Sequence, residues 1–167
     1  LRILDAKGRE LTYSDDEPGL RGDARLHYTF ATAGDYVIEV RDIRYQGGAG
    51  HFYRLRVGDF PCLSSPYPLG VTRGSVGKVT FVGPDAEGVG AVDVRAPSET
   101  GTNWVNVAAR RPNGKSSGFA MLRIEDGPVA VEAEPNNELA KATRVELGHS
   151  LNGKIDASGD VDHFVFA

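Results

Sequence analysis

Apolar and polar residues alternate with a period of two along much of the chain. Residues 24–30, 35–42 and 51–57 each carry apolar side chains at every second position, and most of the residues between them are polar or charged. This alternation is typical of a β-strand that buries one face. The pattern predicts antiparallel β-structure over residues 1–58. The positions expected to point inward are Tyr36, Ile38 and Val40 in the second run, and Tyr53, Leu55 and Val57 in the third.

The composition of the sequence changes near residue 59. Prolines are concentrated between residues 59 and 68, and we expect them to interrupt any strand ladder there. Beyond them, short apolar runs recur at even spacing and are separated by turn residues. This spacing predicts a small immunoglobulin-like β-sandwich over residues 59–128. Its expected strands are residues 78–82, 91–95, 103–109 and 119–125.

Composition narrows the class of protein. The 167 residues include 21 glycines and 9 prolines and are 40% hydrophobic, which favours a globular all-β chain with many turns over a helical bundle. The net charge is −4 and the basic residues do not cluster, so we expect no nucleic-acid partner. No apolar run reaches the roughly 18 to 20 residues of a membrane span. Cys62, the single cysteine, is expected to be a small core residue.

Residues 129–167 carry the most distinctive motifs. They are Glu-Pro-Asn-Asn at 134–137, Asn-Gly at 152–153 and Gly-Asp-x-Asp-x-Phe at 159–164. In this order and spacing they resemble the opening half of the bacterial pre-peptidase C-terminal (PPC) domain. Residues 1–58, with Gly-Asp-Tyr at 34–36 and Tyr-Arg-Leu at 53–55, resemble the closing half of the same module.

The resemblance implies a domain organisation. Residues 1–58 would be a closing half, residues 59–128 a sandwich, and residues 129–167 an opening half, cut from a longer chain with tandem copies. Together the terminal halves have about the length of one jelly-roll-like PPC β-sandwich. Each alone would leave strand edges open, so we expect them to pair within the chain or between two chains by strand exchange.

The resemblance also implies a function. The family has no catalytic residues, so we expect a non-enzymatic accessory or interaction module of a bacterial protein that is secreted, periplasmic or on the cell surface. Expected partners are other domains of the parent protein, an extracellular polymer or protein ligand, and a second copy of the chain. Two alternatives stay open. The segment could be the C-terminal accessory part of a secreted peptidase or other hydrolase, or a structural subunit of an envelope assembly.

Oxygen-bearing side chains in the same region suggest a calcium site. Ca²⁺ takes roughly six to eight oxygen ligands, and pairs of acidic residues two apart lie on one side of an extended segment. Calcium sites of the resembling family in bacterial collagenases use a similar set. The alternative is an acidic linker that caps a helix over residues 138–142, followed by an ordinary turn. The candidate ligands are Glu132, Glu134, Asn136, Asn137, Asp160 and Asp162.

Two further features have a chemical and a structural interpretation. Residues 114–118 match the Gly-x-Ser-x-Gly string around a nucleophilic serine, but that chemistry needs a strand before it and a helix after it. We expect Ser116 to lie in a hairpin loop instead. Trp104 could be an exposed aromatic platform for a sugar or peptide, although a core or interface position is favoured.

Overall fold

The computed structural model describes residues 1–17, 20, 22–84, 86–112 and 118–167. In this part of the chain nearly all regular structure is β, and the helical element is one short 3₁₀ turn, η1 (Leu139–Lys141). The predicted all-β class is therefore confirmed. The described residues include no helix with the length and apolar character needed to cross a membrane. Ser116 lies outside the described residues, so the hairpin prediction stays a prediction.

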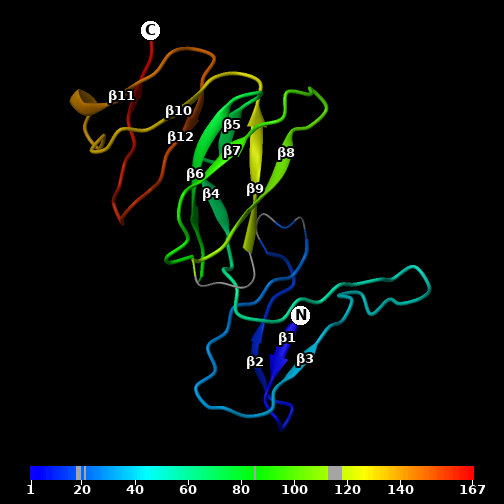
Figure 1. The fold of residues 1–167 in the computed structure, drawn as a ribbon. Coiled ribbons are helices and arrows are strands. Elements are labelled where there is room, and N and C mark those ends of the chain that lie inside the picture. The colour runs from blue at the N-terminus through cyan, green and yellow to red at the C-terminus, as the bar shows by residue number, and fades with distance from the viewer. Residues whose placement is uncertain (18–19, 21, 85, 113–117) are drawn as a thin grey trace.

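The middle of the chain is a sandwich of two three-stranded sheets (Figure 1). One sheet has the order β4-β6-β7 and the other the order β5-β9-β8. All neighbours are antiparallel except β5 and β9, which are parallel. The four strands expected from the sequence are confirmed as β6, β7, β8 and β9. The strands are β4 (Ser65–Tyr67), β5 (Gly70–Thr72), β6 (Val76–Val82), β7 (Val92–Arg95), β8 (Trp104–Ala109) and β9 (Gly118–Glu125).

The core lies between these two sheets. In β9 every second residue from Gly118 to Ile124 is buried, because successive side chains of a strand point to opposite faces. Leu122, at the centre of the strand, has no exposed surface. The buried cluster consists of Leu63, Val71, Val79, Phe81, Ala96, Val107, Ala109, Ala120, Leu122 and Ile124. Cys62 is also buried, as expected.

The proline-rich stretch contributes to the sandwich, which corrects one prediction. Pro66 lies within β4 and is opposite Phe81 of β6. The ladder tolerates it because β4 is an edge strand with a neighbour on one side alone, and a residue without an N–H is accepted at an edge. Proline therefore marks the edge of this sheet rather than a break before it.

Residues 1–58 form a separate small sheet with the order β2-β1-β3. Its strands are β1 (Arg2–Leu4), β2 (Glu10–Tyr13) and β3 (Val37–Glu39), and both pairs are antiparallel. Ile3 in the central strand is buried and pairs with Ile38. The guanidinium of Arg2 donates to Glu39 at 2.8 Å and to Glu10 at 3.1 Å, which ties the three strands together.

Two of the strands expected in this region are absent from the structure. Residues 24–30 and 51–57 have no strand structure. Tyr53, Leu55 and Val57, which were expected to point inward, are exposed. Alternation sets which way side chains point, but a strand also needs a neighbour that completes its hydrogen bonds. No described segment of this chain supplies that neighbour.

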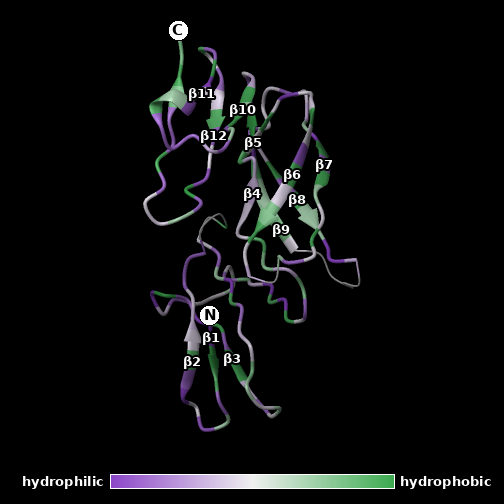
Figure 2. Ribbon diagram, turned by 90° about the vertical axis from the view of Figure 1, so that its left-hand side faces the viewer, coloured by the Kyte–Doolittle hydropathy of each residue, from purple (hydrophilic) through white to green (hydrophobic). Residues whose placement is uncertain are grey.

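Residues 129–167 make two parallel pairs at the other end of the molecule. β10 (Val129–Val131) pairs with β12 (Ser150–Asn152), and β11 (Thr143–Arg144) pairs with β13 (Phe164–Val165). Figures 1 and 2 both show β1–β3 and β10–β13 at opposite ends of the sandwich. Within the described chain the terminal segments share no sheet, so the expected single sandwich built from both halves is not formed in one molecule.

Candidate metal centre

Three carboxylates converge in the C-terminal segment. One oxygen from each of Glu132, Glu134 and Asp162 lies within 4.8 Å of the other two. The two glutamates follow β10 and lie two apart in the chain, whereas Asp162 lies two residues before the start of β13. The chain around Asp162 is fastened to the glutamate segment by the next residue, since the backbone N–H of His163 donates to the carbonyl of Asn136 at 3.2 Å. Folding therefore brings together carboxylates that lie about thirty positions apart in the sequence.

Several polar atoms at the cluster are buried without a partner. Glu132 Oε2 and Asp162 Oδ1 accept no hydrogen bond from any described residue. The side chain of Asn136 is 0% exposed, yet neither its Oδ1 nor its Nδ2 has a partner there. Its backbone N–H donates to Glu134 at 2.9 Å, which places it beside the cluster. Buried polar groups are nearly always hydrogen-bonded or hydrated, so the oxygens among these atoms are available to water or to a cation.

The carboxylate of Glu132 is held in a fixed orientation. Its Oε1 accepts the backbone N–H of Lys154 at 2.6 Å and the hydroxyl of Tyr67 at 3.2 Å. Because Tyr67 belongs to β4, this carboxylate also joins the C-terminal segment to the sandwich. Burial and the negative charge of Glu132 raise the pKa of Tyr67 to about 12, so the phenol stays protonated and continues to donate. The remaining oxygen, Oε2, is thereby left for the cluster.

Gly153 supplies the space behind the cluster. A Cβ atom at this position would lie 2.5 Å from Glu132 Oε2 and 3.2 Å from Asp162 Oδ2. The first distance is shorter than real Cβ contacts allow, so a side chain here would displace the Glu132 carboxylate. The sequence marks Asn152-Gly153 as a turn, and its role in seating two carboxylates is visible only in three dimensions.

The electrostatics of the cluster are unfavourable without a counter-charge. The pKa of Asp162 is raised first by burial and then by the charges of Glu132, Asp160 and Glu134. Negative charges at this spacing oppose ionisation of the Asp162 carboxyl. Either a proton or a cation relieves the repulsion, and a divalent cation offsets it while also satisfying the unpartnered oxygens.

Two of the six expected ligands lie elsewhere. Asp160 is not one of the three converging carboxylates, and its Oδ2 accepts the backbone N–H of Asp156 at 2.6 Å to close a turn. Asn137 is exposed beside the buried Asn136. The alternative of a capped helix fits no better, since η1 has three residues and Glu138 makes no side-chain cap. Of the expected set, the structure brings together the carboxylates of Glu132, Glu134 and Asp162 and buries the Asn136 side chain.

The donor set is one of hard oxygens. Three carboxylates and an amide oxygen suit Ca²⁺, which would complete its coordination with water and backbone carbonyls. No thiol or imidazole nitrogen belongs to the described cluster, so it lacks the ligands that zinc and copper prefer. The Nδ1 of His163 lies 3.1 Å from the carbonyl of Asn136 and supports the backbone at the site.

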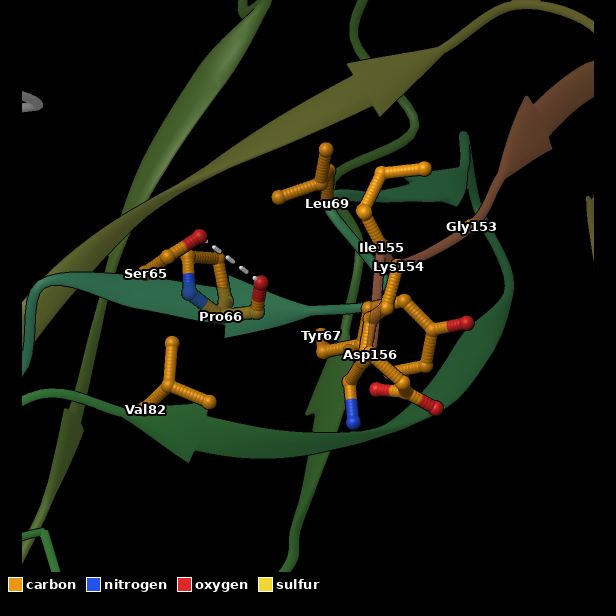
Figure 3. A pocket seen from close by; sticks show the side chains of 9 residues that line it. All are labelled: Ser65, Pro66, Tyr67, Leu69, Val82, Gly153, Lys154, Ile155 and Asp156. Carbon is orange, nitrogen blue, oxygen red and sulfur yellow. Dashed lines mark hydrogen bonds between the residues drawn. The ribbon is translucent and has the colours of Figure 1, made fainter. Parts of the chain in front are cut away.

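A groove of about 350 Å³ lies beside the cluster, between β4 and residues 153–156 (Figure 3). Its apolar lining includes Pro66, Leu69 and Ile155, and the Lys154 ammonium lies 4.7 Å from the centre of the Tyr67 ring. Nearby, the Leu69 N–H donates to the buried Oδ1 of Asn152 at 2.8 Å. These contacts hold the C-terminal segment against the sandwich.

Trp104 does not have the favoured core position. It lies on the outer face of β8, is 44% exposed and stands 5.3 Å from the guanidinium of its cross-strand partner Arg123. A cation over an indole face is a stabilising contact in its own right. The tryptophan is therefore available at the surface, and no other described feature gives it a ligand.

The metal-binding interpretation rests on this geometry. Comparison of the chain with protein-family models, with curated proteins and with solved structures found no match.

Proposed function

We propose that this chain is a non-catalytic, calcium-stabilised interaction module of an exported bacterial protein. The ion would be held by Glu132, Glu134, Asn136 and Asp162. The observation that carries the proposal is the set of three buried oxygens without a hydrogen-bond partner among the described residues, Glu132 Oε2, Asp162 Oδ1 and Asn136 Oδ1. The resemblance of residues 129–167 to the PPC opening half supports the same assignment, because sites of that family use similar residues.

The need for an ion follows from the small core of the C-terminal segment. Among the hydrophobic residues of 129–167, Val145 is the one that is buried. So small a core contributes little to offset the entropy of ordering the segment, and small folds often use a metal for this purpose. Calcium at the cluster would link the strand that precedes the glutamates to the strand that follows Asp162, and so join the two small sheets.

The proposed location agrees with the expected affinity. Calcium sites of extracellular modules have Kd values of about 10⁻⁴ to 10⁻³ M, which suits a compartment with abundant calcium. In such a protein the ion would keep the C-terminal segment ordered so that it can space, dock or present neighbouring domains. The proposal assigns no chemical reaction to this chain.

The test is calcium titration followed by calorimetry and thermal unfolding. Binding to the folded state alone stabilises by about 2.7 kcal/mol at a hundredfold excess over Kd, so unfolding should shift upward with calcium and back with chelator. Glu134→Gln should lose the binding heat and the shift. Glu138→Gln, an exposed glutamate on the same segment, is the matched control and should keep both. No binding heat and an unchanged unfolding curve with calcium would contradict the proposal.

A further inference from the structure

Residues 40–58 form an exposed arm beyond β3, which we call the basic arm. Every residue in it is exposed and none is in a strand. Phe52 is 90% exposed. Exposure of so many large apolar side chains along one segment is unusual for a soluble protein and marks an interaction surface. The exposed apolar residues are Val40, Ile43, Tyr45, Phe52, Tyr53, Leu55 and Val57.

The arm is also strongly basic. It contains four arginines and one aspartate, a net charge of +3. The guanidinium of Arg41 lies 4.4 Å from the centre of the Tyr45 ring, and that of Arg56 lies 3.8 Å from the Phe60 ring. Arginine, tyrosine and phenylalanine are enriched at protein interfaces, where they supply much of the binding energy. The partner of this arm should therefore be acidic, with apolar residues of its own.

The C-terminal segment of the same chain has these properties. Residues 129–167 contain seven acidic and three basic residues, a net charge of −4, and a bound Ca²⁺ would leave −2. Within the described chain β12 and β13 each pair with one strand, so each sheet has a free edge. The exposed apolar residues of the segment are Val131, Leu139, Leu147, Leu151, Ile155, Val161, Val165 and Phe166.

The two complementary surfaces cannot meet within one molecule. The arm extends from the β1–β3 sheet, and the acidic segment lies at the opposite end of the sandwich in both Figure 1 and Figure 2. Contact therefore requires a second copy. Because the two surfaces differ, the contact is head-to-tail and repeats along an open chain.

We propose that the basic arm of one copy docks on the C-terminal segment of a second copy. Residues 51–57 add there as a strand along a free edge of the C-terminal sheets. This accounts for the strand pattern of residues 51–57, which pair with no described strand of their own chain. Their pairing strand would belong to the second copy. Strand addition at an open edge provides main-chain hydrogen bonds, and the alternating side chains provide specificity. This inference concerns assembly and goes beyond the calcium proposal.

The experiment measures self-association in calcium by analytical ultracentrifugation, with two blocked variants. The arm-blocked variant is Leu55→Ser with Val57→Ser, and the segment-blocked variant is Val165→Ser with Phe166→Ser. All four side chains are exposed, so the fold should persist, which circular dichroism checks. The control is Val76→Ser on the outer face of the sandwich.

At protein concentrations up to about 1 mM, the unmodified chain should form oligomers whose size grows with concentration. Salt should weaken this association, because the two surfaces carry opposite charge. Each blocked variant should associate at least about tenfold more weakly, and the control should behave like the unmodified chain. An equimolar mixture of the two blocked variants should stop at a one-to-one dimer, since each retains one working surface. A chain that stays monomeric at all concentrations, blocked variants that associate normally, or a mixture that grows beyond a dimer would each overturn the proposal.

Discussion

Asp162 shows at the scale of one residue how negative charge is concentrated in the C-terminal segment. Its pKa is raised because it is partly buried and faces Glu132, Asp160 and Glu134. The same carboxylate that repels its neighbours would be a good ligand for a cation. A negative charge at this position therefore lowers the stability of the ion-free protein and raises its affinity for a cation.

This conflict predicts a reciprocal effect of Asp162→Asn. At neutral pH and in chelator the variant should unfold at a higher temperature than the unmodified chain, because one of three repelling charges is gone. In calcium it should show little or none of the upward shift. Thermal unfolding of both proteins, with and without calcium, measures this. A variant that is destabilised in chelator and still responds fully to calcium would show that Asp162 is not a ligand.

The raised pKa also predicts the pH dependence. In chelator, the stabilisation that Asp162 contributes is fully present below its unfolded pKa and is lost as pH rises through the higher folded pKa. With calcium the sign reverses, because protons compete with the ion, so the gain from calcium should shrink as pH falls through the same window. Unfolding curves across pH for the unmodified chain minus those for Asp162→Asn isolate this residue from other carboxyls such as Asp5, whose pKa is lowered.

Gly153→Ala tests the geometry behind the carboxylates. The added methyl would stand 2.5 Å from Glu132 Oε2, so that carboxylate must move. We expect a calcium affinity lower by about tenfold or more, because coordination depends on oxygen positions within a few tenths of an ångström. Gly159→Ala is not a suitable control because its φ of 88° already disfavours alanine. Gly101→Ala, where nothing lies within 4 Å and φ is not in the left-handed region, should leave affinity unchanged.

At the scale of elements, β8 and β9 carry the stability of the sandwich. β9 is the central strand of its sheet, pairs with both β5 and β8, and buries every second residue. By contrast, the strands of the two terminal segments have two to four residues and bury few apolar side chains. Short, partly exposed ladders open more easily than a packed core. The sandwich is thus the rigid part of the molecule.

Leu122→Ala should destabilise the sandwich by about 2–5 kcal/mol, the usual cost of removing a fully buried leucine side chain. Phe119→Ala, three residues away on the outer face of the same strand, should cost less because its ring is partly exposed. Urea unfolding followed by the fluorescence of Trp104 measures both, since this tryptophan is the only one in the chain and lies on β8. Equal losses for the two variants would mean that the burial pattern of β9 is wrong.

At the scale of the whole molecule, the chain has a well-packed central sandwich and two terminal segments that bury few apolar side chains. The N-terminal piece touches the sandwich through Arg25, which donates to the carbonyl of Leu63 at 2.6 Å. The C-terminal piece touches it through Glu132, which accepts a hydrogen bond from Tyr67 of β4, and through Asn152, which accepts one from the backbone of Leu69. Calcium should act on one end only, because the proposed ligands all belong to residues 129–167.

Hydrogen exchange should therefore respond locally to calcium. Chelator should speed exchange in β10 to β13, whereas amides of β6, β8 and β9 should be unaffected because their protection comes from the hydrophobic core. The basic arm should exchange rapidly in dilute solution with or without calcium. Uniform slowing by calcium across the whole chain would indicate an ion bound elsewhere or a global effect.

The sequence alone determined the β class and the positions of the main sandwich strands. Those strands have a strong period of two, which local side-chain directions fix. It also identified the region that holds the candidate ligands, because oxygen-bearing residues are concentrated there. Pro66 and residues 51–57 show its limit. A strand exists only where a neighbouring strand completes its hydrogen bonds. Pro66 is therefore accepted in an edge strand, whereas residues 51–57 form no strand despite their alternating pattern.

Which of the candidate ligands converge depends on how distant segments pack. Asp160 and Asp162 are equivalent in the sequence pattern, yet one closes a turn and the other meets Glu132 and Glu134. The roles of Gly153 and Tyr67 likewise depend on chain segments that are far apart in sequence. The physical reason is that short-range spacing sets the direction of a side chain, whereas burial, unpartnered oxygens and close approach arise from the packing of distant segments.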